Sequence, residues 1–197
     1  DKTFTVTPTS SLSFSGTYKI RVTTGVKDLA GNTISNDHVA TNGFTTEVIP
    51  LFVVVGGSGS LLTSRDGTTW TARISGTDNS LLGATYGNSS FAVVGGSGII
   101  LTSSYGITWT SRTSGTSKNL RGITYGNSTY VAVGDSGTII TSSDGITWTS
   151  RSGATGNLNG VSYVNSTFVA VGDGGSLLTS PDGTTWTAMT SNTGKQL

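Results

Sequence analysis

Beyond residue 50, apolar and polar residues alternate in short runs that glycine-containing turns separate. The clearest unit contains such runs at 119–125, 129–134, 138–142 and 146–151. Period-two alternation rich in β-branched and aromatic residues predicts strands with one buried face. Glycine-containing turns of two to four residues between such runs predict hairpins. The unit is therefore predicted to be a four-stranded antiparallel meander.

This unit recurs along the chain. Residues 81–113 and 157–190 contain the same succession of runs, and residues 51–74 contain the last three of them. For the first strand of that opening unit, only the degenerate run 46–49 is available. The tryptophans of the chain recur at intervals of 39, 39 and 38 residues, as Trp70, Trp109, Trp148 and Trp186. A repeat of about 40 residues with four strands predicts the blades of a β-propeller.

Residues 50–197 thus form the predicted propeller domain and supply about four blades. Closed propellers contain roughly four to eight blades, so four blades lie at the lower limit. We expect these residues to belong to a larger ring, which further blades or a second copy of the chain would complete.

Residues 1–49 lack the repeat and form a separate predicted domain. Alternating runs at 3–7 and 17–23 and a closing run at 43–47 predict strands. With the connection Lys27-Asp-Leu-Ala-Gly-Asn32, this order resembles the C-terminal half of a bacterial Ig-like domain. The resemblance implies a partial β-sandwich of the kind found in tandem on exported proteins. The expected fold class is therefore all-β, with propeller blades after a partial Ig-like sandwich.

Each repeat contains a turn with the pattern Ser-x-Asp-Gly-x-Thr-Trp. Asp66, Asp144 and Asp182 occupy its acidic position, and Tyr105 replaces the aspartate in the second copy. A carboxylate here can accept hydrogen bonds from backbone N–H groups of its own turn, and the glycine supplies the positive φ that the turn needs. The tryptophan, predicted to lie in the fourth strand, can seal one blade against its neighbour. We therefore expect a structural role for these residues.

The same pattern resembles the Asp-box of sialidases and of many other bacterial propellers with BNR-like repeats, although one residue fewer separates the Asp from the Gly. The resemblance implies a propeller, and it implies that these turns lie on the face opposite the ligand site. It implies no particular activity, because the motif occurs in enzymes and in non-enzymes.

Composition excludes several classes of function. The net charge is +1 and 11% of the residues are charged, so no basic surface indicates nucleic-acid binding. The chain has no Cys, one His and a single Glu, Glu47, so we expect neither a metal site nor a cofactor. No apolar run reaches the roughly 20 residues that a membrane-spanning helix needs.

Two catalytic patterns are incomplete in this sequence. Gly134-Asp-Ser-Gly137 matches the tetrapeptide around the nucleophile of trypsin-like proteases, but it is one variant of a turn found in every repeat. The single His, His38, lies outside the repeats, so the serine has no candidate base there. Sialidases of this repeat class need an arginine trio, a Tyr-Glu pair and an acidic donor, and the repeats contain no Glu. A glycosidase would therefore need catalytic residues from outside this sequence.

Binding is the function that remains. The connections from the fourth strand of one repeat to the first strand of the next are the longest and most varied, and strand alternation places them on the face of the turns between the second and third strands. Five cations lie on or beside these connections: Arg73, Arg112, Arg151, Lys118 and Arg121. Either they contact a protein or glycan partner, or the aliphatic stems of the three arginines that recur in register cover the blade edges.

We therefore expect a non-catalytic binding or scaffold module outside a bacterium or on its outer surface, with a signal sequence outside these residues. One alternative is a sialidase-like glycoside hydrolase. The other is a propeller assembly factor similar to those that help to build photosynthetic complexes.

Overall fold

The computed structural model describes residues 17–18, 21–22, 38–39, 44–45 and 51–197. The chain divides into two units, Asp1–Pro50 and Leu51–Leu197. In the first unit, β1 (Thr17–Tyr18) pairs with β4 (Phe44–Thr45), and β2 (Arg21–Val22) pairs with β3 (His38–Val39), both antiparallel. The predicted strands at 3–7 and 46–49 lie outside the described residues.

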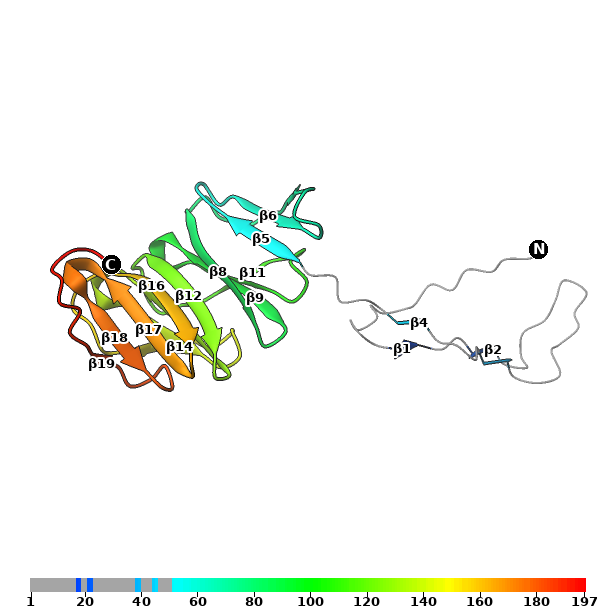
Figure 1. Cartoon of the computed structure of the whole chain (residues 1–197). Coiled ribbons are helices and arrows are strands. Elements are labelled where there is room, and N and C mark those ends of the chain that lie inside the picture. Colours follow the sequence, from blue (N-terminus) through cyan, green and yellow to red (C-terminus); the bar gives the residue numbers. More distant parts are fainter. Residues whose placement is uncertain (1–16, 19–20, 23–37, 40–43, 46–50) are drawn as a thin grey trace, which may run out of the picture. The chain divides into compact units, whose positions relative to one another are not determined.

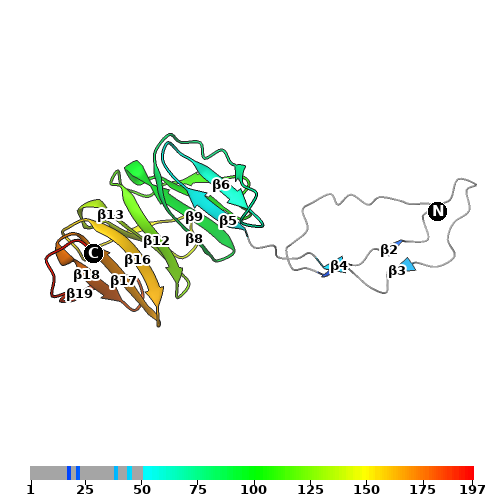
Figure 2. The same cartoon turned by 45° about the horizontal axis from the view of Figure 1, so that its top comes forward.

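Residues 51–197 form four antiparallel sheets that follow one another as blades (Figures 1 and 2). We label the strands of each complete blade a to d in chain order. Blade 1 contains strands b to d: β5 (Phe52–Val55), β6 (Leu61–Ser64) and β7 (Thr71–Ala72). Blade 2 contains β8 (Leu81–Gly87), β9 (Ser90–Gly95), β10 (Ile100–Ser103) and β11 (Thr110–Arg112).

Blade 3 contains β12 (Leu120–Gly126), β13 (Thr129–Gly134), β14 (Ile139–Ser142) and β15 (Thr149–Arg151). Blade 4 contains β16 (Leu158–Val164), β17 (Thr167–Gly172), β18 (Leu177–Ser180) and β19 (Thr187–Ala188). A short 3₁₀ turn joins strands b and c in the last three blades: η1 (Gly96–Gly98), η2 (Asp135–Gly137) and η3 (Asp173–Gly175). These meanders confirm the predicted all-β propeller fold.

The three a strands, β8, β12 and β16, lie side by side along the inner edges of their blades (Figures 1 and 2). Glycines permit this approach. A Cβ atom on Gly83 would lie 3.4 Å from Gly122 Cα, and one on Gly122 would lie 3.2 Å from Gly160 Cα. The ring of Tyr125 likewise covers Gly87, where a Cβ would lie 2.0 Å from the ring. The spacing of the inner strands therefore depends on residues without side chains.

The blades pack face to face, with an apolar cluster between each neighbouring pair. Leu61, Leu81, Val93 and Leu101 form the cluster between blades 1 and 2. Val94, Ile100, Tyr130 and Ile140 belong to the next, and Val133, Ile139, Phe168 and Leu178 to the third. Strand β13 is buried from Tyr130 to Gly134 because a blade covers each of its faces.

The two ends of this arc are exposed among the described residues. In blade 1, Phe52 is 50% and Val54 is 45% exposed. In blade 4, β17 alternates between buried and half-buried residues, because blade 3 covers one of its faces only. The arc thus presents an apolar face at each end.

The tryptophans lie one residue before strand d, not within it as the sequence predicts. Each still packs at a blade interface where a preceding blade is described. In blade 3, the ring centroids of Tyr125 and Tyr130 are 4.6 Å apart, and those of Tyr130 and Trp148 are 6.2 Å apart. Trp148 thereby contacts the cluster between blades 2 and 3.

Candidate functional site

The turns between strands c and d are closed by side-chain hydrogen bonds. In blade 3, the backbone N–H groups of Ile146 and Thr147 both donate to Asp144 Oδ1, each at 2.8 Å. Ser142 Oγ donates to the same oxygen at 2.9 Å. Trp148 Nε1 donates to the carbonyl oxygen of Gly145 at 3.3 Å. Because the turn uses these backbone donors, strand d begins only after the tryptophan.

The same turn is built around Asp66 in blade 1 and Asp182 in blade 4. Trp70 Nε1 and Trp186 Nε1 also donate to the carbonyl of the turn glycine. Blade 2, with Tyr105 at the acidic position, differs. Gly106 N still donates to Ser103 Oγ at 2.8 Å, but the buried Trp109 Nε1 has no hydrogen-bond partner among the described residues. The turn therefore forms without a carboxylate.

These carboxylates make stability depend on acid pH. The N–H groups of Thr147 and Ile146 lower the pKa of Asp144 to about 2, against about 3.9 in an unfolded chain. A lowered folded-state pKa contributes stability that is present above the unfolded pKa and is lost as the pH falls through the folded one. We expect the urea midpoint to fall between about pH 4 and pH 2.

This fall of the urea midpoint with decreasing pH should be shallower in Asp144→Asn. It should be steeper in Tyr105→Asp, which gives blade 2 the same carboxylate. Urea titrations followed by tryptophan fluorescence at several pH values would measure both. If the pH dependence is identical in all three proteins, the turn carboxylates have no such role.

The three arginines that recur in register lie along the outer edges of blades 1 to 3. The Nε atoms of Arg73, Arg112 and Arg151 donate to the hydroxyls of Thr63, Thr102 and Thr141 in strand c, at 2.8, 2.8 and 2.9 Å. Those threonines are buried and the arginines are half-buried. Each arginine therefore lies across its own blade and uses one donor within it.

Met189 takes the place of this arginine in blade 4. Its N–H donates to Leu177 O, as that of Arg73 donates to Leu61 O. The two other predicted cations lie elsewhere: Lys118 is exposed in the loop after blade 2, and Arg121 follows the first residue of strand β12. Of the five predicted cations, three thus lie on the outer edges of the blades, Lys118 lies in a connecting loop and Arg121 lies on an inner strand.

A chain of polar contacts joins the turns between strands b and c on the inner edge. Arg121 Nε and Asn119 Nδ2 both donate to the carboxylate of Asp135. Asn119 Oδ1 also accepts from the backbone N–H of Ser97 in blade 2, at 3.0 Å. A single asparagine therefore connects a turn of its own blade to the turn of the preceding blade.

The same arrangement connects blades 3 and 4. Asn157 Oδ1 accepts from Ser136 N at 2.9 Å, and Asn157 Nδ2 donates to Asp173 at 2.9 Å. Hydrogen bonds from Asn159 and Asn157, and the nearby charge of Arg121, lower the pKa of Asp173. The sequence analysis did not predict these asparagine contacts between blades. Their signal in the sequence is an Asn directly before the first leucine of two a strands.

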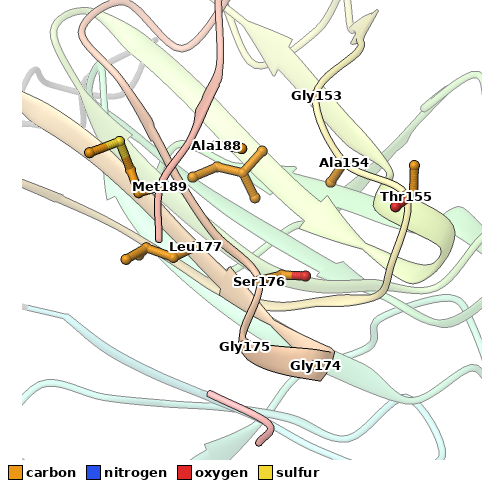
Figure 3. Close-up of a pocket in the computed structure, with 10 residues that line it drawn as sticks. Gly153, Ala154, Thr155, Gly174, Gly175, Ser176, Leu177, Ala188 and Met189 are labelled. Atoms are coloured by element: carbon orange, nitrogen blue, oxygen red, sulfur yellow. The ribbon is translucent and has the colours of Figure 1, made fainter. Parts of the chain in front are cut away.

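A pocket of about 410 Å³ opens beside blade 4 (Figure 3). Its lining comes from the loop before the blade, from the turn η3, from strand c and from the end of strand d, and includes Gly153, Ala154, Ser176, Leu177, Ala188 and Met189. We call this the blade 4 pocket. Two departures from the repeat coincide there. The loop between Arg151 and Leu158 is one residue shorter than its counterparts, and Met189 replaces the recurrent arginine.

The loops between strands d and a lie beside the turns between strands b and c. A Cβ atom on Gly137 would lie 2.1 Å from Ala154 O, and one on Gly98 would lie 2.0 Å from Thr116 O. We call this surface, made of residues 73–80, 112–119, 151–157 and the three 3₁₀ turns, the loop face. Residues 153–155 and 174–175 of this face also line the blade 4 pocket, so the pocket opens on the loop face beside the shortened loop.

Within the described ranges, no three His, Asp or Glu side chains gather in a way that could hold a metal ion. The part of the chain that the structure describes also contains no helix long and apolar enough to cross a membrane.

Comparisons with known proteins agree with this architecture. The family model described as "Bacterial Ig-like domain" matches residues 1–46. No curated protein shows significant sequence similarity to the chain. Among solved structures, "YCF48 bound to D1 peptide" superposes with a TM-score of 0.56 and 24% identity, over 69% of this chain and 48% of that one.

A second solved structure, "YCF48 from Cyanidioschyzon merolae", superposes with a TM-score of 0.54 and 22% identity, over 69% of this chain and 51% of that one. The chain thus spans about half the length of both structures. At this level of identity the likeness concerns the fold. The chain combines an Ig-like segment with the blades of a β-propeller.

Proposed function

We propose that this chain is a non-catalytic binding module whose partner is a protein, and that the partner contacts the loop face at the blade 4 pocket. The observation that carries the proposal is that the repeat is broken at the place where this pocket forms. Two departures from the repeat at one place, one in loop length and one in a side chain, favour a local function there.

The chemistry of the pocket suits an apolar side chain. Leu177 and Met189 provide flexible and apolar walls, while Gly153 and its neighbours expose backbone groups. Methionine adapts to varied shapes, and buried apolar anchors in such pockets dominate many protein interfaces. Exposed aromatic side chains could stack on the sugar rings of a glycan, but those of the described residues lie at or near the other ends of the strands: Phe52, Trp70, Tyr86 and Tyr105.

Described carboxylates do not support catalysis. Asp135 and Asp173, in two of the 3₁₀ turns of the loop face, both accept hydrogen bonds from neighbouring side chains. The other described acidic residue of this face, Asp78, lies in the loop before blade 2. A general acid for glycoside cleavage needs a raised pKa, whereas that of Asp173 is lowered. This supports a binding role over a glycosidase.

The five cations are assigned different roles in this proposal. Arg73, Arg112 and Arg151 stabilise their blades through strand c. Lys118 lies in the loop face, and Arg121 donates to Asp135 in one of its 3₁₀ turns, so these two are the cations that the partner would meet. The match to a bacterial Ig-like domain at residues 1–46 supports a location outside the cell or on its surface. The solved YCF48 structure with a bound D1 peptide supports a peptide-like partner for a fold of this kind.

Met189→Arg is expected to weaken binding strongly without loss of stability. It restores the residue of the other blades, and Thr179 is available in strand c at the position of the threonines that accept from those arginines. Peptides would be selected from a phage-displayed random library on the wild-type chain, and their affinities measured by fluorescence anisotropy. We expect a loss of at least about tenfold in Met189→Arg, with unfolding free energy within about 0.5 kcal/mol of wild type.

Met189→Leu is the matched control, because it keeps the pocket apolar and should retain binding. Selected peptides that bind Met189→Arg as tightly as the wild type would place the binding site elsewhere. Hydrolysis of a fluorogenic sialoside by the purified chain would instead support the glycosidase.

A further inference from the structure

Met189 carries the one thioether of the chain. The sequence contains a single methionine and no cysteine, so no other sulfur competes for an oxidant. The side chain of Met189 is 48% exposed and lines the blade 4 pocket (Figure 3). Oxidation converts a flexible, apolar methionine into a polar sulfoxide. An oxidant that reaches this sulfur would therefore change the chemistry of the pocket wall.

The position of Met189 is also accessible in the other blades. Arg73, Arg112 and Arg151 occupy it in blades 1 to 3, and each of them is half-buried although another blade follows. Hydrogen peroxide is a small molecule, so partial exposure of this kind is enough for it to reach the side chain. The accessibility of Met189 thus does not depend on its place in the last described blade.

The recurrent arginines show where an oxygen added to Met189 would lie. Their Nε atoms are 2.8 or 2.9 Å from a threonine hydroxyl of strand c. The Sδ of methionine takes the place of arginine Cδ along the side chain, so an oxygen bonded to Sδ takes the place of Nε. Thr179 lies in strand c at the position of those threonines. A threonine hydroxyl accepts from an arginine, and it can equally donate to a sulfoxide oxygen.

We propose that Met189 is an oxidation site that controls partner binding, an inference that rests on the proposed function of the blade 4 pocket. A hydroperoxide transfers one oxygen to Sδ: the O–O bond breaks, the S–O bond forms, the sulfur is oxidised, and hydrogen peroxide is reduced to water. The new oxygen accepts a hydrogen bond from the Thr179 hydroxyl. The side chain then lies across strand c as the arginines do, and the pocket loses an apolar wall.

The test compares peptide binding before and after oxidation of the full chain. The probe is a peptide selected on the wild-type chain that contains no methionine or cysteine, and fluorescence anisotropy measures its affinity. Hydrogen peroxide is added until mass spectrometry shows one added oxygen, which peptide mapping must place on Met189, and is then removed. We expect at least about tenfold weaker binding. Methionine sulfoxide reductase with dithiothreitol should restore the affinity.

Met189→Leu is the matched control for the oxidation. Leucine has no sulfur, so the same peroxide treatment should leave the affinity of this variant for the peptide unchanged. A fall in its affinity after treatment would show that peroxide acts at another residue, and it would overturn the proposal.

Thr179→Val tests the hydrogen bond that we assign to the oxidised side chain. Thr179 is half-buried, and valine has its shape without the hydroxyl. Oxidation should leave the urea midpoint of the wild type unchanged and lower that of Thr179→Val, because the sulfoxide oxygen then has no donor in strand c. An equal shift in both proteins would overturn the assignment of Thr179.

Equal affinity of the oxidised and the reduced wild-type chain for the peptide would overturn the control of binding by oxidation. The proposed function would stand in that case if Met189→Arg still binds the peptide weakly. Equal binding by Met189→Arg and the wild type would instead contradict the proposed function itself, so the two failures are distinguishable.

Discussion

Trp148→Ala is expected to lower the free energy of unfolding by about 3–5 kcal/mol. The ring packs against the cluster between blades 2 and 3, and its centroid lies 6.2 Å from that of the buried Tyr130. Removal of the ring leaves a cavity at this interface. Tyr130 cannot move to fill the cavity, because its hydroxyl is hydrogen bonded to the carbonyls of Gly87 and Ser90 in blade 2. Urea denaturation followed by circular dichroism would measure the loss.

Trp70→Ala is the matched control in blade 1. Trp70 makes the same hydrogen bond to its turn glycine, but its side chain is 38% exposed and no preceding blade is described. Its removal should cost less, about 1–2 kcal/mol. Equal losses for the two substitutions would show that the tryptophans stabilise their own turns only. An unchanged urea midpoint in Trp148→Ala would remove the packing role altogether.

Gly134→Ala is expected to cost about 3 kcal/mol, in the upper part of the range for overpacking. A Cβ atom at this position would lie 1.9 Å from Asn119 O, a backbone atom at the start of strand a. A backbone atom cannot rotate away, so the pairing of β12 with β13 would have to shift. Differential scanning calorimetry and urea denaturation would both detect the loss.

Gly56→Ala makes the same change at the same repeat position in blade 1. No strand a contacts it among the described residues, so the substitution should alter the unfolding free energy by no more than about 0.5 kcal/mol. A loss as large as that of Gly134→Ala would mean that a strand already occupies the inner edge of blade 1. Neutral behaviour of both variants would contradict the close approach of the inner strands.

The fold follows from the sequence because each repeat carries the same strand and turn signals. The run 129–134 coincides with β13, since alternating residues there are flanked by glycine turns on both sides. Strand d begins later than the alternation 146–151 predicts, because Asp144 takes the backbone donors of residues 146 and 147. Such competition between a side chain and the strand ladder leaves no mark in the hydrophobic pattern.

The candidate site is harder to predict from the sequence than the fold. Arg112 and its equivalents were candidate binding residues because they recur in each repeat. Their Nε atoms donate hydrogen bonds within their own blades, and the alternation of apolar and polar residues does not predict this. The blade 4 pocket arises where repetition fails, at Met189 and in a loop shortened by one residue. Departures from the repeat are visible in the sequence, but only the structure shows that these two lie together.

The central claim, that a protein partner binds at the blade 4 pocket, is tested most directly by hydrogen–deuterium exchange with and without a selected peptide. We predict slower exchange in residues 153–155 and 174–178 of the wild-type chain, and no change in Met189→Arg. Slower exchange confined to the turns between strands c and d, on the opposite face, would contradict it.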